Sequence, residues 1–214
     1  MLVAAAVCPQ TPLIVSQLPD LRSACHTAIA ALRAARPDTL IVVGPAESTA
    51  AYDARAAGTL RPWGLDDTIG EGEPVLPLSL TVGRLLLQGD APGQAIAHDT
   101  PPAGCLALGA ELAARGDRVA LLVMADGSAC LSSRAPGKYD DDAKPVNDLI
   151  ATAVAEADQA ALAGLDPERA DRLWVSGRPA LQVLAGAAGP AAFTGRLLAQ
   201  SEPYGVGYFA GIWS

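Results

Sequence analysis

Short apolar runs alternate along the chain with longer stretches in which apolar residues recur every three or four positions. Three runs (2–7, 39–43 and 118–124) are almost wholly aliphatic and predict strands that are buried on both faces. Between the first two runs, residues 20–36 place their apolar side chains on one helical face, and Pro37 ends the helix. The opening of the chain therefore predicts a strand–helix–strand unit of the kind found in parallel sheets.

The same alternation continues to the end of the chain. We expect helices over residues 78–87, 104–115, 145–163 and 179–187, strands over 94–98 and 173–176, and a closing strand pair over 190–199 and 206–213. Residues 44–77 are rich in glycine and proline and predict a long irregular loop, which in a compact domain is usually functional. The whole pattern predicts an α/β fold with a mainly parallel central sheet and helices on both faces, in a single compact domain spanning residues 1–214.

Composition narrows the classes of function. Half of the 214 residues are hydrophobic and 18% are charged, which excludes a disordered chain. Alanine is abundant while aromatic residues make up only 4%, so we expect a core of small aliphatic side chains with closely packed helices. The formal net charge is −8 and the basic residues are scattered singly, which argues against a nucleic-acid partner.

Two further patterns bear on the compartment. No apolar run approaches the roughly 18 residues that a membrane helix needs, so we expect no membrane association. The apolar residues before Cys8 lack the basic flank of a signal peptide, and the run is too short for one. The sequence therefore predicts a cytoplasmic protein with reduced cysteines.

Ligands of open α/β sheets bind beyond the carboxyl ends of the strands. Four segments are expected there, namely residues 9–12, 44–47, 126–130 and 176–179, and none of them is a glycine-rich phosphate loop. The chain has only two histidines, His26 and His98, and its four cysteines (Cys8, Cys25, Cys105 and Cys130) lack zinc-site spacing. Asp126 follows the most apolar strand, where it either caps the turn or faces a ligand.

Four motifs occur in an order that resembles a known family. They are Cys8–Leu13 (CPQTPL), Leu40–Pro45 (LIVVGP), Val119–Cys130 (VALLVMADGSAC) and Tyr204–Tyr208 (YGVGY). Together they resemble the class III extradiol ring-cleavage dioxygenases, B-subunit type, of which the protocatechuate 4,5-dioxygenase β subunit is the model member. The resemblance spans nearly the whole chain and implies the same α/β fold. It also implies a site for ferrous iron held by two histidines and a glutamate, with a third histidine as acid/base.

The residues that the resemblance assigns to this chemistry are replaced. Gln10 and Ala46 stand at the two positions of the histidine ligands, Ala129 stands at the acid/base histidine, and Arg178 aligns with the glutamate. Losing even a partner of a metal ligand typically lowers affinity ~10–100-fold, and losing the ligands themselves lowers it further. The resemblance therefore implies a catalytically degenerate, metal-free member with no cofactor.

The former active-site cleft is then expected to bind a small anionic or aromatic molecule. Its predicted lining consists of Gln10, Ala46, Glu47, Asp126, Ser128, Ala129 and Arg178. Arg178 is expected to supply a fixed positive charge there, because a guanidinium presents a rigid fork of donors to a carboxylate. The opposing expectation is that Arg178 turns outward or pairs with Asp171 or Glu202.

Three alternatives remain open. The protein is an active iron dioxygenase with relocated ligands such as His98, Glu47 and Asp126, an enzyme that uses Cys130 or Cys8 in redox chemistry, or a scaffold without a ligand. Cys130 has no predicted base nearby, so we expect a thiol of ordinary reactivity. Members of the family commonly assemble, and the resemblance therefore also implies a homo-oligomer.

Overall fold

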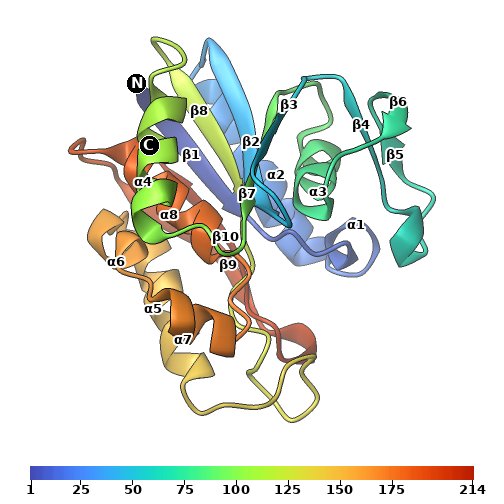
Figure 1. Ribbon diagram of the computed structural model, residues 1–214, viewed down its shortest axis with the longest axis vertical. Coiled ribbons are helices and arrows are strands. Elements are labelled where there is room, and N and C mark those ends of the chain that lie inside the picture. Colours follow the sequence, from blue (N-terminus) through green and yellow to red (C-terminus); the bar gives the residue numbers. More distant parts are fainter.

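The computed structural model describes all 214 residues and is built on a seven-stranded sheet (Figure 1). In sheet order, the strands are β3 (Ala50–Tyr52), β7 (Gly93–Ala97), β2 (Thr39–Ala46), β8 (Val119–Met124), β1 (Leu2–Cys8), β10 (Tyr208–Trp213) and β9 (Gly195–Ser201). The four central strands β7, β2, β8 and β1 are parallel, and β3, β10 and β9 join antiparallel at the edges. The predicted α/β fold with a mainly parallel sheet is confirmed.

Helices cover both faces of this sheet (Figure 1). One face carries α1 (Leu13–Ser16), α2 (Pro19–Ala34) and α3 (Leu78–Leu87), and the other carries α4 (Pro102–Ala113), α5 (Ala143–Glu156), α6 (Gln159–Ala163), α7 (Pro167–Arg172) and α8 (Arg178–Ala188). Strand β1 shows why its sequence is apolar throughout. Ala5 and Val7 pack into one core while Ala4 and Ala6 pack into the other. None of the helices is both long and apolar enough to cross a membrane.

Small residues let the helices pack closely, as the composition predicts. A Cβ atom added to Gly109 of α4 would lie 2.1 Å from the carbonyl oxygen of Val183 in α8. A Cβ atom added to Gly186 of α8 would lie 2.1 Å from the carbonyl oxygen of Leu106. Side chains at either position would therefore force the two helices apart.

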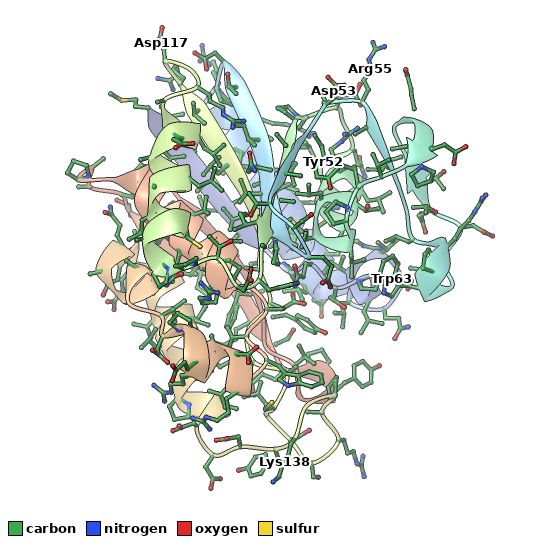
Figure 2. All side chains as sticks on the ribbon, in the orientation of Figure 1. Tyr52, Asp53, Arg55, Trp63, Asp117 and Lys138 are labelled. Atoms are coloured by element: carbon green, nitrogen blue, oxygen red, sulfur yellow. The ribbon has the colours of Figure 1, made fainter.

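The predicted loop over residues 44–77 is wrong in detail. It contains β3 and a separate three-stranded sheet of β5 (Thr68–Ile69), β4 (Ala56–Thr59) and β6 (Glu71–Pro74), with the 3-10 helix η1 (Arg61–Trp63). This small sheet projects beyond α3, and Trp63 lies near its end (Figures 1 and 2). Strands of two to four residues, such as the fully exposed β6, are too short and too polar to leave an apolar pattern.

Two other predictions near the carboxyl end also need correction. The single helix predicted over 145–163 is two helices, because Ala157 adopts φ +54° and the Asp158 side chain then caps α6 by accepting from the Ala161 N–H. The strand predicted over 173–176 is a turn between α7 and α8, in which Trp174 has φ +52°. The closing strand pair is confirmed as β9 and β10, which are joined through the 3-10 helix η2 (Pro203–Gly205).

Candidate functional site

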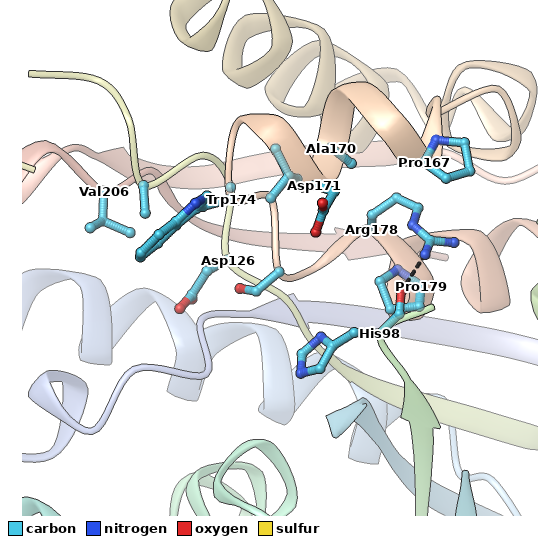
Figure 3. Close-up of a pocket in the computed structure, with 13 residues that line it drawn as sticks. His98, Asp126, Pro167, Ala170, Asp171, Trp174, Arg178, Pro179 and Val206 are labelled. Atoms are coloured by element: carbon cyan, nitrogen blue, oxygen red, sulfur yellow. Dashed lines mark hydrogen bonds between the residues drawn. The ribbon is translucent and has the colours of Figure 1, made fainter. Parts of the chain in front are cut away.

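A cavity of about 410 Å³ lies at the carboxyl edge of the parallel strands (Figure 3). The loops after β7 and β8 and the α7–α8 turn enclose it. Its lining combines polar side chains with apolar walls and comprises His98, Asp126, Gly127, Ala129, Pro167, Ala170, Asp171, Trp174, Val175, Ser176, Arg178, Pro179 and Val206. This is the place where the parallel sheet predicts a ligand site.

Gln10, which stands at a ligand position of the resembling family, links the loop after β8 to the α7–α8 turn. Its backbone N–H donates to Oδ1 of Asp126 at 2.9 Å, and its side-chain Nε2 donates to Oγ of Ser176 at 2.8 Å. The Oε1 atom of the same amide is buried without a partner. Gln10 therefore braces the back of the cavity and leaves one hydrogen-bonding atom unsatisfied.

Asp126 carries the most perturbed acid–base group of the cavity. Its carboxyl group accepts one hydrogen bond, from Gln10, and no cationic side chain forms an ion pair with it. Burial raises the pKa of Asp126 to about 7, and the N–H of Gln10 only partly offsets this effect. Burial also raises the pKa of the neighbouring Tyr208 to about 12. Near neutral pH this carboxyl group exists in both protonation states.

Arg178 is buried at the other end of the cavity (Figure 3). Its guanidinium donates to the carbonyl oxygens of His98 and Thr100 and to Oε1 of Gln182. No carboxylate lies within ion-pair distance, so neither Asp171 nor Glu202 pairs with it, and Glu202 contacts Lys144 instead. The expectation that Arg178 turns outward or pairs with a local acid is wrong. Its positive charge is hydrogen-bonded but has no counter-charge in the protein.

Trp174 forms an aromatic wall on the side of the cavity away from Arg178 (Figure 3). The residue is 56% exposed, and its backbone adopts the left-handed region, which costs a non-glycine residue about 1–2 kcal/mol. Ion pairs hold the preceding helix α7 to the loop before α5. Arg172 pairs with Asp140 and with Asp142, the latter at 2.6 Å, and Arg169 pairs with Asp142 at 3.3 Å. These ion pairs tie the helix that precedes Trp174 to the loop before α5.

The structure brings most of the predicted site residues to this edge. Asp126, Ala129 and Arg178 line the cavity, and Gln10 lies behind Asp126 and Ser176. Ala46 adjoins it through its carbonyl oxygen, which accepts the backbone N–H of His98 at 3.1 Å.

Glu47 and Ser128 do not line the cavity. Glu47 is exposed beyond the end of β2. Ser128 is fully buried, where its hydroxyl donates to the Leu173 carbonyl and its N–H donates to Asn147. Ser128 is therefore a structural residue that holds the turn after β8 against the α7–α8 segment.

The donor set of the cavity does not fit the ferrous iron that the resemblance implies. The positions of the expected ligands hold an amide, a methyl group and a guanidinium, in Gln10, Ala46 and Arg178. No group of three or more His, Cys, Asp or Glu side chains is arranged to hold a metal ion anywhere in the structure. An iron site of this type needs three such ligands on one face of the metal.

The cysteines are buried and lie outside the cavity lining. Hydrogen bonding to Cys25 and burial raise the pKa of the Cys8 thiol well above its usual value. Burial likewise raises the pKa of Cys130. Both effects disfavour the thiolate form on which redox or nucleophilic chemistry depends.

Sequence reasoning missed the walls of the cavity. Trp174, Val206 and the α7 residues Pro167, Ala170 and Asp171 were not expected at the site. Trp174 offered one signal, because it is among only three tryptophans in a chain that is poor in aromatic residues. However, the pattern of residues 173–176 predicts a strand, and a strand prediction gives no indication of an exposed ring in a turn.

Comparison with known proteins adds information on the fold. No protein-family model and no curated protein matches the sequence. Among solved structures, the chain is similar to the crystal structure of uncharacterized protein JW3007 from Escherichia coli K12, with a TM-score of 0.60 and 14% sequence identity over 99% of each chain. At this identity the similarity shows a shared fold over the whole chain.

Proposed function

We propose that this protein is a catalytically degenerate, metal-free relative of the extradiol dioxygenases that binds a small aromatic carboxylate in the former active-site cleft. One observation carries the proposal. A buried arginine without a counter-charge and an exposed aromatic ring line the same cavity from opposite sides (Figure 3). This pairing suits a ligand with an anionic group at one end and a flat apolar body.

The volume of the cavity and the charges around it support this class of ligand. About 410 Å³ is within the usual range of small-molecule pockets. Arg178 begins helix α8, whose amino-terminal end adds a partial positive charge at the same point. Trp174 and Val206 offer apolar contact on the other side. The exposed carboxylate of Asp171 opposes an anion, but water screens it.

The enzymatic alternatives have less support. Of the relocated iron ligands considered, only His98 and Asp126 line the cavity, and two donors do not make the three-ligand face that an iron dioxygenase uses. Redox chemistry at Cys8 or Cys130 would need an accessible thiolate, and both thiols are buried. A scaffold role without a ligand is an outcome of the experiment below.

Calorimetric titration with benzoate at pH 6 tests the proposal. We expect one binding site in the unmodified protein and about tenfold weaker binding in Trp174→Ala, which removes the aromatic wall. Trp63→Ala is the matched control, because Trp63 is similarly exposed but lies on the small sheet away from the cavity (Figure 2). Absence of benzoate binding, or equal loss in both variants, would contradict the proposal and favour the scaffold.

A further inference from the structure

Asp126 is placed so that a proton on its carboxyl group changes the charge of the cavity. The side chain is only 9% exposed and lines the same cavity as Arg178. Oδ1 accepts the N–H of Gln10, and no other group of the protein donates to the carboxyl group. One oxygen of a buried carboxyl group is therefore left for a ligand or for a proton.

The charged and titratable groups around Asp126 come from every neighbouring element. His98 follows β7, Asp171 lies at the end of α7 and Arg178 begins α8. Tyr208 begins β10, where its backbone bridges to that of Asp126. The only cation in this set, Arg178, donates to His98, Thr100 and Gln182, and it forms no ion pair with Asp126. No neighbour therefore holds Asp126 in its ionised form.

We infer that the protonation state of Asp126 selects the charge of the ligand that this cavity accepts, an inference that rests on the function proposed above. In its neutral form the carboxyl group adds no charge to the cavity and can donate a hydrogen bond to a ligand. In its ionised form it adds a negative charge that repels an anion bound in the same cavity, and it accepts hydrogen bonds from donors instead.

The buried surroundings of Asp126 place its change of protonation near neutral pH. Burial raises the pKa of Asp126 to about 7, so the neutral form dominates below neutral pH and the carboxylate dominates above it. When only the neutral form binds an anion, the apparent dissociation constant is the intrinsic constant divided by the neutral fraction. Between pH 5.5 and pH 8.5 that fraction falls about 30-fold for a group with this pKa.

The test compares benzoate with benzamide, its uncharged analogue of nearly the same shape. Benzoate stays ionised between pH 5.5 and 8.5, so a change in its affinity reports on the protein. In the unmodified protein we expect benzoate binding to weaken about 30-fold across this range, while benzamide binding changes less than threefold. In Asp126→Asn, which cannot ionise, we expect benzoate binding to be independent of pH.

His98 is the histidine that lines the same cavity, and His98→Gln is the matched control. We expect this variant to keep the pH dependence of benzoate binding. The inference is overturned if benzoate binds the unmodified protein equally well at all pH values, if the dependence persists in Asp126→Asn, or if His98→Gln removes it. In these three cases benzoate still binds, so the proposed function stands.

Absence of binding and failure of the variant to fold are the two remaining outcomes. If neither benzoate nor benzamide binds at any pH, the proposed function fails, and the inference fails with it. If Asp126→Asn does not fold, the contrast between benzoate and benzamide on the unmodified protein, together with His98→Gln, decides the question. Equal pH profiles for the two probes would then overturn the inference.

Discussion

Replacing Asp126 with asparagine is expected to stabilise the fold at neutral and alkaline pH. The substitution keeps the shape of the side chain and an oxygen that accepts the Gln10 N–H, but it removes the ionisable group. The pKa of the carboxyl group rises from 3.8 to about 7 on folding. Each unit corresponds to about 1.4 kcal/mol, so the ionised carboxylate lowers the free energy of unfolding by at most about 4 kcal/mol.

The sign follows from the order in which the two states lose the proton. Because the pKa of Asp126 is raised in the folded state, the unfolded chain ionises first as the pH increases from about 4. Stability is therefore lost between about pH 4 and pH 7 and stays constant above that range. Asp126→Asn does not undergo this loss, so its advantage over the unmodified protein grows across the same interval.

Urea unfolding of both proteins between pH 4 and pH 8.5 measures this difference directly. We expect similar stabilities at pH 4 and a gain of about 2–4 kcal/mol for Asp126→Asn at pH 8. Asp171→Asn is the control, because that carboxylate lines the same cavity but is exposed, and its substitution should change the free energy of unfolding by less than about 0.5 kcal/mol. Parallel curves for the unmodified protein and Asp126→Asn would refute the reasoning about burial.

Three further predictions test the packing and the thiols. Gly109→Ala should lower the free energy of unfolding by about 1–3 kcal/mol, because its Cβ would clash with α8. Gly89→Ala is the control, since its Cβ meets nothing closer than 3.9 Å, and it should change the free energy by less than about 0.5 kcal/mol. Equal effects of the two substitutions would show that the close packing of α4 on α8 contributes little. Cys130→Ser should leave the fold and benzoate binding nearly unchanged, and a rapid single-site alkylation of native Cys130 at pH 7 would show a reactive thiol instead. Arg178→Lys should destabilise the protein by about 2–3 kcal/mol in urea unfolding, because an ammonium group cannot reproduce the guanidinium contacts to His98, Thr100 and Gln182. Unchanged stability would show that these contacts contribute little.

The sheet could be predicted from the sequence because burial on both faces leaves a simple signature. The runs at 2–7, 39–43 and 118–124 became β1, β2 and β8, which are adjacent central strands. The small sheet could not be predicted, because β5 has two residues and β6 is exposed throughout. The left-handed backbone conformations of Ala157 and Trp174 could not be predicted either, since alanine and tryptophan usually avoid this region.

The candidate site could likewise be predicted from the sequence only in part. Rules for parallel sheets predicted the edge at which Asp126, Ala129 and Arg178 meet. The roles of single side chains depended on partners that no local pattern reveals. Ser128 is buried because it forms hydrogen bonds with Leu173 and Asn147. Arg178 donates to the His98 carbonyl oxygen after β7, about 80 residues earlier in the chain.

The most direct test of the central claim is the iron content of the purified protein after anaerobic reconstitution with ferrous iron and dialysis. We predict far less than one equivalent, because Gln10, Ala46 and Arg178 stand where the resemblance places the iron ligands and no other set of three ligands is present. One equivalent of iron retained through dialysis, and lost in His98→Ala or Glu47→Gln, would contradict the account and establish a relocated metal site.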